Sequence, residues 1–351
     1  MIGNRPQFIK AAAVSPSLRE EDEELLIHTG QHHDDELSRV FFEELGLPGP
    51  DVELGIFGGS NSSQTARMLA ALQPKVSELA PDVMLVYGDT NSTLAGALAG
   101  AQAGFPVAHV EAGMRSFDRS MPEELNRVVA DHASSLLLCS STAAVENLHR
   151  ENVTAQVELV GDVMVDVALR VQPEVRDRTD VLSAYGVQPD DYLLVTAHRA
   201  GNVDDPARLE QLVSLLLALP DPAVLPLHPR TKDRLERSGG LSKLAEAPHL
   251  TLTGPLGYVE LTALLCHARA VLTDSGGLQK EAYLAAVPCV TLRSTTEWVE
   301  TVENEWNVLV DLDVEATLRA LARRPPKERP GLYGDGRAGE RVVSSLRLHY
   351  G

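Results

Sequence analysis

The chain has 351 residues, of which 44% are hydrophobic and 4% aromatic, and this length predicts two domains rather than one core. Its formal net charge of −19 at pH 7 disfavours nucleic acid as a partner, because a polyanion would be repelled. No apolar run reaches the roughly 18–20 residues of a transmembrane helix, and the N-terminus lacks a signal-peptide pattern. We therefore expect a cytoplasmic protein with no membrane partner.

Short apolar runs alternate with longer helical patterns along the chain. The predicted strands cover residues 25–28, 83–87, 107–110, 136–139 and 157–160, and then 192–196, 223–227, 250–252, 270–273 and 288–292. The helical patterns between them include residues 63–79, 93–103 and 207–219. This alternation is typical of parallel sheets with helices on both faces.

The strands form two groups, separated by the polar, charge-rich segment 166–191. We expect two doubly wound α/β domains that face a common cleft, with ligands bound at the carboxyl ends of the strands. One conflict concerns the loop at residues 3–6, because only Met1 and Ile2 precede it where a strand is expected. The three cysteines lie far apart without zinc spacing and predict buried, reduced thiols and no metal site.

The segment 273–279, Thr-Asp-Ser-Gly-Gly-Leu-Gln, follows a predicted strand and opens a helical pattern. A helix start offers backbone N–H groups and a positive dipole end to an anion, and Gly276 and Gly277 permit its close approach. The Ser275 hydroxyl would add a donor, and Glu281 would accept hydrogen bonds from ribose hydroxyls. The plain alternative is a helix capped by Asp or Ser.

Three acidic residues in the first half are candidates for proton transfer. Asp89 follows a predicted strand, Glu111 emerges from an apolar strand, and Glu123 lies at a helix start. A carboxylate in such a strand needs solvent, a partner or a function. The alternatives are an N-cap role for Asp89, an ion pair between Glu111 and Arg115, and ordinary capping by Glu123.

Cationic residues suited to a diphosphate lie at two places. His198 and Arg199 directly follow a predicted buried strand, and a histidine there can bind phosphate or transfer a proton near neutral pH. Arg5 and Lys10 lie near the N-terminus. The Arg5 guanidinium could donate two hydrogen bonds to a phosphate, and Lys10 would add a positive charge. The alternatives are a satisfied loop histidine and solvated surface cations. No phosphate-loop motif and no intact Gly-x-Gly-x-x-Gly fingerprint occurs, which disfavours an ATPase or a dehydrogenase.

The motifs together resemble those of the non-hydrolysing UDP-N-acetylglucosamine 2-epimerase family over nearly the whole chain. The matching residues are Arg5-Pro6 with Lys10, Thr29-Gly30-Gln31-His32, Gly88-Asp89-Thr90, His109-Val110-Glu111-Ala112-Gly113, Pro122-Glu123-Glu124-Leu125-Asn126-Arg127, Thr196-Ala197-His198-Arg199, Asp274-Ser275-Gly276-Gly277 and Tyr333-Gly334-Asp335-Gly336.

This resemblance implies a GT-B-like architecture of two Rossmann-like domains. Residues 1–165 would form the domain with the catalytic carboxylates, joined by a returning helix at 336–351, and residues 166–335 would form the UDP-binding domain. It also implies a homodimer, a UDP-sugar substrate, and no cofactor or metal in the chemistry.

The implied reaction interconverts UDP-N-acetylglucosamine and UDP-N-acetylmannosamine. UDP leaves by anti elimination to give 2-acetamidoglucal and adds back by syn addition. By resemblance the catalytic residues are Asp89, Glu111, Glu123 and His198; the residues leave open which carboxylate removes the proton and which returns it. The implied substrate-binding residues are Arg5, Lys10, Arg115, Arg199, Ser275, Gly276, Gly277, Glu281 and Arg293.

Some positions depart from the usual family pattern. Glu297-Trp298 stands where many members have Glu-Arg, Gln7-Phe8 stands where Glu-Ala is common, and the loop 116–121 is short. These variants resemble the branch that epimerises UDP-2,3-diacetamido-2,3-dideoxyglucuronate, which we keep as an alternative substrate beside a GT-B glycosyltransferase. Asp34 replaces a glutamine of an activator site found in some bacterial members, so activation by a second UDP-sugar is not expected.

Overall fold

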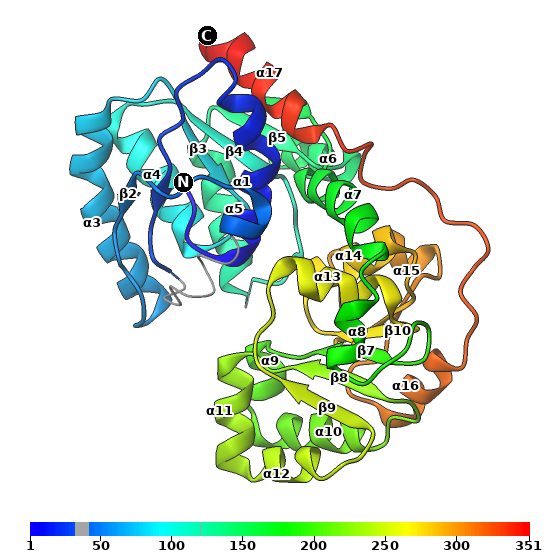
Figure 1. The fold of residues 1–351 in the computed structure, drawn as a ribbon. Helices are drawn as coiled ribbons and strands as arrows, with labels where there is room; N and C mark the ends of the chain where they lie inside the picture. Colours follow the sequence, from blue (N-terminus) through cyan, green and yellow to red (C-terminus); the bar gives the residue numbers. More distant parts are fainter. Residues whose placement is uncertain (32–41, 120) are drawn as a thin grey trace. The chain divides into compact units, whose positions relative to one another are not determined.

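The structure, a computed structural model, describes residues 1–31, 42–119 and 121–351. The chain divides into two compact units, which we call the first domain (Met1–Val167 with Tyr333–Gly351) and the second domain (Ala168–Leu332) (Figure 1). The first boundary falls inside helix α7 (Val163–Arg176), and α8 (Asp180–Ala184) follows it. The polar segment that separates the two groups of strands is therefore largely helical.

The second domain contains a six-stranded parallel sheet in the order β12-β11-β10-β7-β8-β9. Its strands are β7 (Leu193–Thr196), β8 (Ala223–Pro226), β9 (Leu250–Thr253), β10 (Ala270–Thr273), β11 (Cys289–Thr291) and β12 (Asn307–Leu309). The chain proceeds outward from β7 to one edge and then from β10 to the other, as in a Rossmann domain. The order therefore reverses between β7 and β10, and ligands of such sheets bind at the carboxyl ends of the strands beside that point.

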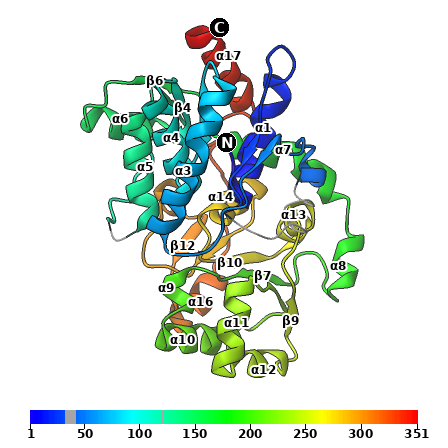
Figure 2. The ribbon, with the colours of Figure 1, turned by 90° about the vertical axis from the view of Figure 1, so that its left-hand side faces the viewer.

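Apolar side chains cover both faces of this sheet. In β7, Leu193 and Val195 belong to one core cluster, whereas Leu194 belongs to another. Figures 1 and 2 show α10, α11 and α12 on one side and α13 and α14 on the other. A strand buried on both faces needs a continuous apolar run, which is the pattern that predicted these strands. The remaining helices of this domain are α9 (Ala200–Val203), α10 (Pro206–Leu217), α11 (Pro229–Ser238), α12 (Gly240–Ala245), α13 (Tyr258–His267), α14 (Gly276–Ala285), α15 (Val299–Glu303) and α16 (Val314–Leu321).

The first domain has a four-stranded parallel sheet in the order β3-β4-β5-β6 and a two-stranded sheet, β1-β2. The strands are β1 (Ile27–His28), β2 (Val52–Glu53), β3 (Met84–Tyr87), β4 (Val107–Ala112), β5 (Leu136–Cys139) and β6 (Gln156–Leu159). The helices are α1 (Arg5–Leu18), α3 (Asn61–Leu79), α4 (Asn91–Ala103), α5 (Pro122–Ala133), α6 (Thr142–Arg150) and α17 (Ala338–Tyr350).

Ile2 occupies the place of a strand between β1 and β3. Its backbone N–H donates to Ile27 at 2.9 Å, its carbonyl accepts from Thr29 at 2.9 Å, and the Met1 amino group donates to the Leu85 carbonyl at 2.8 Å. A bridge at Ile2 therefore precedes the turn at Gly3 and Asn4, whereas Arg5 and Pro6, predicted to lie in the same loop, already belong to helix α1. Gly3 is required at the turn, because a Cβ there would lie 2.1 Å from the Ser92 hydroxyl oxygen.

Two groups of helices cover this domain. Side chains of α3, α4 and α5 form one cluster with β3 residues such as Val86. Helix α17 approaches α1 so closely that a Cβ on Gly339 would lie 2.1 Å from the Ala13 carbonyl oxygen (Figure 2). Asp166 accepts a hydrogen bond from the Gly339 N–H at 2.7 Å, which anchors the start of α17. The C-terminal helix is thereby built into the first domain.

The predicted α/β class with parallel sheets is confirmed, and each of the predicted strands overlaps an observed one. Pattern reading missed β2 and β12, which are too short to show a period. Cys139 and Cys289 are buried as expected, whereas Cys266 is half-buried. Among the described residues, no helix is long and apolar enough to cross a membrane.

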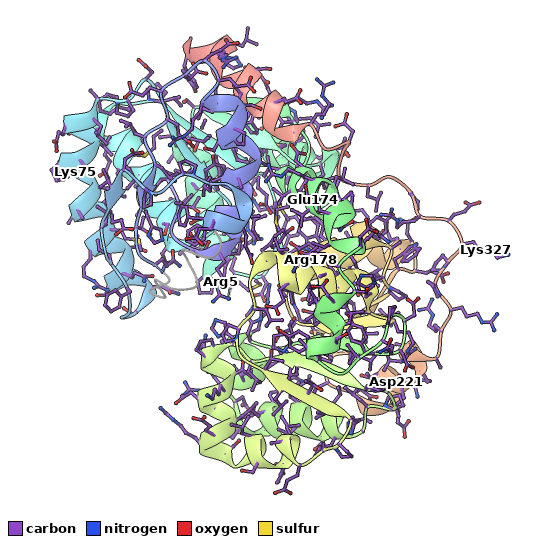
Figure 3. The ribbon with its side chains drawn as sticks, viewed as in Figure 1. Arg5, Lys75, Glu174, Arg178, Asp221 and Lys327 are labelled. Carbon is purple, nitrogen blue, oxygen red and sulfur yellow. The ribbon has the colours of Figure 1, made fainter. Side chains whose placement is uncertain are left out.

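Charged side chains such as Lys75 and Lys327 point away from the ribbon (Figure 3).

Candidate functional site

The ends of β3 and β4 bring several predicted residues of the first domain together. Asp89 follows β3, and its carboxylate accepts from the Arg127 guanidinium at 2.5 Å. The Asp89 carbonyl accepts from Asn126 at 3.0 Å, so helix α5 holds this loop by two side chains. Thr90, rather than Asp89, caps α4, in a reciprocal arrangement with Thr93. The capping alternative for Asp89 is therefore wrong, and its half-exposed carboxylate is available to a ligand.

Glu111 has an unusual backbone. Its φ is +69°, and the pairing of β4 with β5 shifts register between Val110 and Ala112, which marks a β-bulge. A left-handed conformation costs a non-glycine residue energy, and strain of this kind clusters at functional sites. The bulge takes Glu111 out of the regular alternation of the strand, and its side chain forms an ion pair with Lys10.

Lys10 connects this carboxylate to the Asp89 loop. Its side chain is 8% exposed, and its ammonium nitrogen lies 2.7 Å from where a Cβ of Gly88 would be. Burial alone would lower the pKa of Lys10, but the carboxylates of Glu111 and Asp89 outweigh burial and raise that pKa above its usual value. A buried positive charge thus pairs with one candidate proton-transfer group, Glu111, and interacts electrostatically with the other, Asp89.

Arg115 does not pair with Glu111, contrary to the ion pair considered from sequence. Its guanidinium contacts Asp131 at 2.7 Å and Glu151 at 2.8 Å, and its side chain is 1% exposed. With these partners it is part of a buried structural network. This placement favours a structural role for Arg115 over the predicted contact with substrate.

The two adjacent acids at the start of α5 have different surroundings. Glu123 is exposed, whereas Glu124 is 4% exposed and accepts from the backbone N–H groups of Ser116 and Phe117 and from Arg127. Glu124 therefore shapes the loop before α5, and Glu123 is the acid that solvent or a ligand can reach. Arg5 is half-buried in the first turn of α1, after the N-cap residue Asn4.

In the second domain, Asp274 organises the point where the strand order reverses. It is fully buried after β10 and accepts from the backbone N–H groups of His198 and Arg199, both at 3.0 Å, and from the Asn202 amide at 3.1 Å. The loop that follows β7 is therefore fastened to the residue that precedes α14. The predicted His198-Arg199 pair and the predicted glycine turn lie together for this reason.

Helix α14 begins at Gly276 with Ser275 as its N-cap. The Ser275 hydroxyl accepts from the Leu278 N–H at 3.5 Å, so the capping alternative describes the serine correctly. A Cβ on Gly276 would lie 3.6 Å from both Glu297 and the Trp298 indole nitrogen, and 3.9 Å from the Arg199 guanidinium. The helix start thus opens toward two hydrogen-bond donors and one carboxylate.

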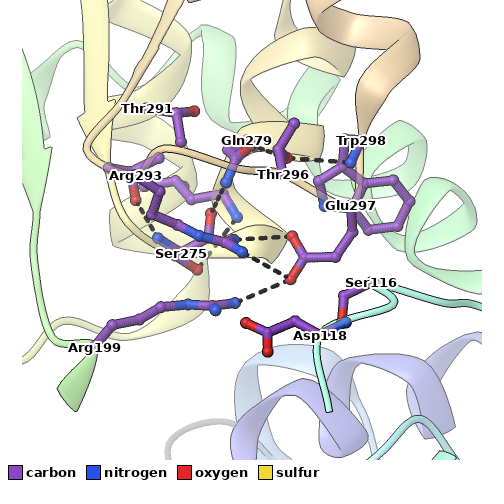
Figure 4. A network of polar contacts seen from close by, with 12 residues as sticks. Ser116, Asp118, Arg199, Ser275, Gln279, Thr291, Arg293, Thr296, Glu297 and Trp298 are labelled. Carbon is purple, nitrogen blue, oxygen red and sulfur yellow. Dashed lines mark hydrogen bonds and ion pairs between the residues drawn. The ribbon is translucent and has the colours of Figure 1, made fainter. Parts of the chain in front are cut away.

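Glu297 binds two arginines beside this helix start (Figure 4). Arg293 contacts its carboxylate at 2.8 Å and Arg199 at 3.2 Å. Although burial raises the pKa of Glu297, the two guanidinium groups outweigh it and lower that pKa to about 2. The arginines predicted to bind substrate are therefore held by an internal anion next to the α14 N-terminus.

These two contacts of Glu297 predict that the free energy of unfolding depends on pH. The pKa of Glu297 falls from 4.5 to about 2 on folding, which corresponds to about 3 kcal/mol. Because a lowered folded-state pKa stabilises above the unfolded-state value, the contribution is complete above roughly pH 5 and is lost as the pH falls toward 2. We expect Glu297→Gln to lower the free energy of unfolding at pH 7, with a difference from wild type that shrinks below pH 4.5.

Urea unfolding at several pH values measures this difference. Glu236→Gln is the matched control, since Glu236 is exposed and its ion pair with Lys232, the one found for it within the described ranges, spans 3.8 Å. A difference for Glu297→Gln that stays constant from pH 7 to pH 3 would contradict the ionised contact.

His198 and Glu281 complete the predicted set. The His198 side chain is 40% exposed, with Nδ1 3.5 Å from Asp274, and its ring lies 5.6 Å from that of His228. Glu281 is 7% exposed on α14, and burial together with the Glu281 carboxylate raises the pKa of the nearby Tyr258 phenol. His32 and Asp34 lie outside the described residues. Within the described ranges, no cluster of three or more His, Cys, Asp or Glu residues has a metal-binding arrangement.

Comparisons with known proteins identify one family for this chain. A model of the family described as UDP-N-acetylglucosamine 2-epimerase matches residues 17–347. A UDP-N-acetylglucosamine 2-epimerase homolog of Methanococcus maripaludis is 43% identical, with 99% of this chain and 98% of the relative covered. The UDP-2,3-diacetamido-2,3-dideoxy-D-glucuronate 2-epimerase of Pseudomonas aeruginosa is 44% identical over the same shares. The crystal structure of Methanocaldococcus jannaschii UDP-GlcNAc 2-epimerase, in complex with UDP-GlcNAc and UDP, has a TM-score of 0.92 at 38% identity, with 99% and 98% covered.

Proposed function

The chain belongs to the UDP-N-acetylglucosamine 2-epimerase family, and from this premise we propose that it interconverts UDP-N-acetylglucosamine and UDP-N-acetylmannosamine. The observation that carries the proposal within the structure is the placement of Asp89 and Glu111 at the ends of adjacent strands, with Lys10 beside both. Two carboxylates near one ammonium group supply the groups that an acid–base pair needs, one to remove the C2 proton and one to return it.

The proposed chemistry starts at the bond between the sugar C1 and the diphosphate oxygen. Because the C2–H group is a weak acid, we place cleavage of this bond ahead of proton transfer, and UDP departs with the bonding electrons. A carboxylate of the first domain then takes the C2 proton, and the C1=C2 double bond of 2-acetamidoglucal forms. In the reverse step a proton returns to the other face of C2 and UDP adds to C1. Asp89, Glu111 and Glu123 are the candidate groups for these transfers.

The second domain supplies the proposed grip on UDP. The N-terminus of α14 offers backbone N–H groups to the diphosphate, and His198, Arg199 and Arg293 add donors. Glu281 is proposed to accept from the ribose hydroxyls. In this proposal Glu297 forms ion pairs with Arg199 and Arg293 in the absence of ligand. When UDP binds, the diphosphate takes over part of these ion pairs.

A substitution at the helix start tests this placement of the diphosphate. In Gly276→Ala, the new methyl group would have only ordinary contact distances to its neighbours, and an alanine in the first turn favours the helix. We therefore expect unchanged or slightly higher thermal stability but at least about tenfold weaker UDP binding by calorimetry, since the methyl group fills the space in front of the N–H groups. Wild-type UDP affinity in this variant would count against the site.

A second substrate, UDP-2,3-diacetamido-2,3-dideoxyglucuronate, is favoured by two observations. Trp298 stands where an arginine is common, and its indole nitrogen lies by the α14 start; the Pseudomonas aeruginosa relative named for this substrate is 44% identical. Incubation of the enzyme with each UDP-sugar in deuterated water, followed by NMR, decides between them. Deuterium at C2 and the second epimer should appear with the true substrate.

The same experiment tests the reaction class. A GT-B glycosyltransferase would give no deuterium at C2, and a hydrolysing epimerase would release free N-acetylmannosamine and UDP. No exchange with either UDP-sugar would overturn the proposed function. We further propose that the protein acts as a homodimer in the cytoplasm, without nucleic-acid or membrane partners; light scattering of the purified protein measures the dimer.

A further inference from the structure

His109 and Asp131 form a buried pair in the first domain. His109 lies on β4, two residues before Glu111, and Asp131 lies on α5; neither side chain is exposed. The His109 Nδ1 atom is 2.7 Å from an Asp131 carboxylate oxygen, and its Nε2 atom is 2.7 Å from the Gly88 carbonyl oxygen. Both ring nitrogens thus meet an oxygen at hydrogen-bonding distance.

These contacts determine the protonation of the ring. The Gly88 carbonyl can only accept, so Nε2 carries a proton. Asp131 also accepts from Arg115 and from the Gly113 N–H, which a carboxylate does as an anion, so Nδ1 carries a proton as well. Although burial raises the pKa of Asp131, His109 and Arg115 lower it below its usual value. The contacts of His109 therefore fit a ring that donates from both nitrogens.

The pair connects the backbone on both sides of the candidate carboxylates. Gly88, which accepts from His109, immediately precedes Asp89. Gly113, which donates to Asp131 at 3.1 Å, follows Glu111 by two residues. Gly113 has φ +77°, and a Cβ there would lie 2.3 Å from the Ala144 carbonyl oxygen, so the turn itself admits little adjustment.

We propose that His109 and Asp131 are positioning residues, which hold the Asp89 loop and the Glu111 bulge at the separation that C2 proton transfer requires. The inference rests on the proposed function. Proton transfer needs donor and acceptor within hydrogen-bonding reach, and a misplacement of 1 Å costs about 100-fold in rate. UDP binding is assigned to the second domain, so loss of the pair should act on turnover far more than on UDP affinity.

Three variants separate positioning from simple stability. His109→Gln and Asp131→Ala each leave at least one of the bonded groups without its partner, and we expect kcat to fall about 100-fold with UDP Kd within about threefold. Asp131→Asn is the conservative variant, because its amide can donate to a neutral His109 while its oxygen still accepts from Gly113 and Arg115. We expect it to keep kcat within about tenfold of wild type.

The control is His349→Gln, in the same domain. His349 contacts Glu158 at 2.7 Å, which reproduces the histidine–carboxylate chemistry on β6 and α17. We expect wild-type kcat for this variant. A His349→Gln enzyme that loses kcat like His109→Gln, or a His109→Gln and an Asp131→Ala enzyme that keep wild-type kcat, would overturn the positioning role.

Nitrogen NMR gives a readout that does not depend on turnover. In ¹⁵N-histidine-labelled enzyme at pH 7, the signals lost in His109→Gln should show two protonated ring nitrogens, and Asp131→Asn should convert one of them to an unprotonated nitrogen. One unprotonated nitrogen in the wild-type ring would overturn the inference. If the wild-type enzyme itself exchanges no C2 deuterium, the proposed function fails. This outcome is distinct from failure of the positioning role, which is judged from the variants relative to an active wild-type enzyme.

Discussion

Glu111→Gln is expected to slow C2 proton exchange at least about 1,000-fold while UDP affinity stays within about threefold of wild type. Glutamine has the shape of glutamate but cannot take a proton from carbon at neutral pH. The backbone at residue 111 is strained at φ +69°, and strain of this kind clusters at functional sites, which supports a role for this side chain in the reaction. Deuterium incorporation measured by NMR gives the rate, and calorimetry gives the UDP affinity.

The variant also disturbs Lys10, and the experiment must separate this effect from the chemistry. Loss of one partner from a buried ion pair costs about 3–5 kcal/mol, although Asp89 remains near the ammonium group. We therefore expect a lower melting temperature for Glu111→Gln. Adding Lys10→Met to Glu111→Gln should restore much of the stability but none of the exchange.

Glu158→Gln is the matched control for this prediction. Glu158 lies on β6 of the same sheet and pairs with His349, so the substitution removes an ion pair without touching the candidate acid–base groups. Wild-type exchange is expected there. Exchange by Glu111→Gln at the wild-type rate would remove Glu111 from the mechanism.

The sequence predicted the inner strands well because strands such as β5, β7 and β10 are buried on both faces of their sheets. Runs such as Leu193–Thr196 and Ala270–Thr273 need apolar residues at successive positions, and this leaves a local signal. Polar residues that directly follow such runs lie at the carboxyl edge of a parallel sheet. That position makes Asp89 and His198 candidates from sequence, and the family resemblance implies their roles.

Contacts between distant residues left no such signal. Whether Glu111 pairs with Lys10 or with Arg115 depends on the bulge in β4, and a positive φ at a glutamate has no pattern in sequence. Glu123 and Glu124, at the start of α5, are the same residue type at adjacent positions, so the sequence does not distinguish them, but only Glu124 is buried. Glu297 pairs with Arg199 across 98 positions of chain, and no spacing rule connects them.

Asp274→Asn is expected to weaken UDP binding at least about 30-fold, with a lower melting temperature. The carboxylate accepts from the His198 N–H with both oxygens and from the Arg199 N–H and the Asn202 amide with one of them, whereas asparagine keeps a single acceptor oxygen and turns an NH₂ group toward the His198 N–H. Each buried donor left without an acceptor costs about 1–3 kcal/mol. The loop with His198 and Arg199 should then separate from the start of α14.

Asp274→Asn changes a residue that lies outside the proposed contacts with UDP. Asp274 is fully buried, so it cannot contact UDP directly, and a loss of affinity must come from the loop that it holds. Asp313→Asn is the matched control, because Asp313 caps α16 in the same domain and asparagine caps equally well. Calorimetry with UDP should show wild-type affinity for the control. Wild-type affinity for Asp274→Asn as well would mean that the diphosphate does not depend on the joined β7 and β10 loops, and the helix start at Ser275 would lose its main support as the UDP site.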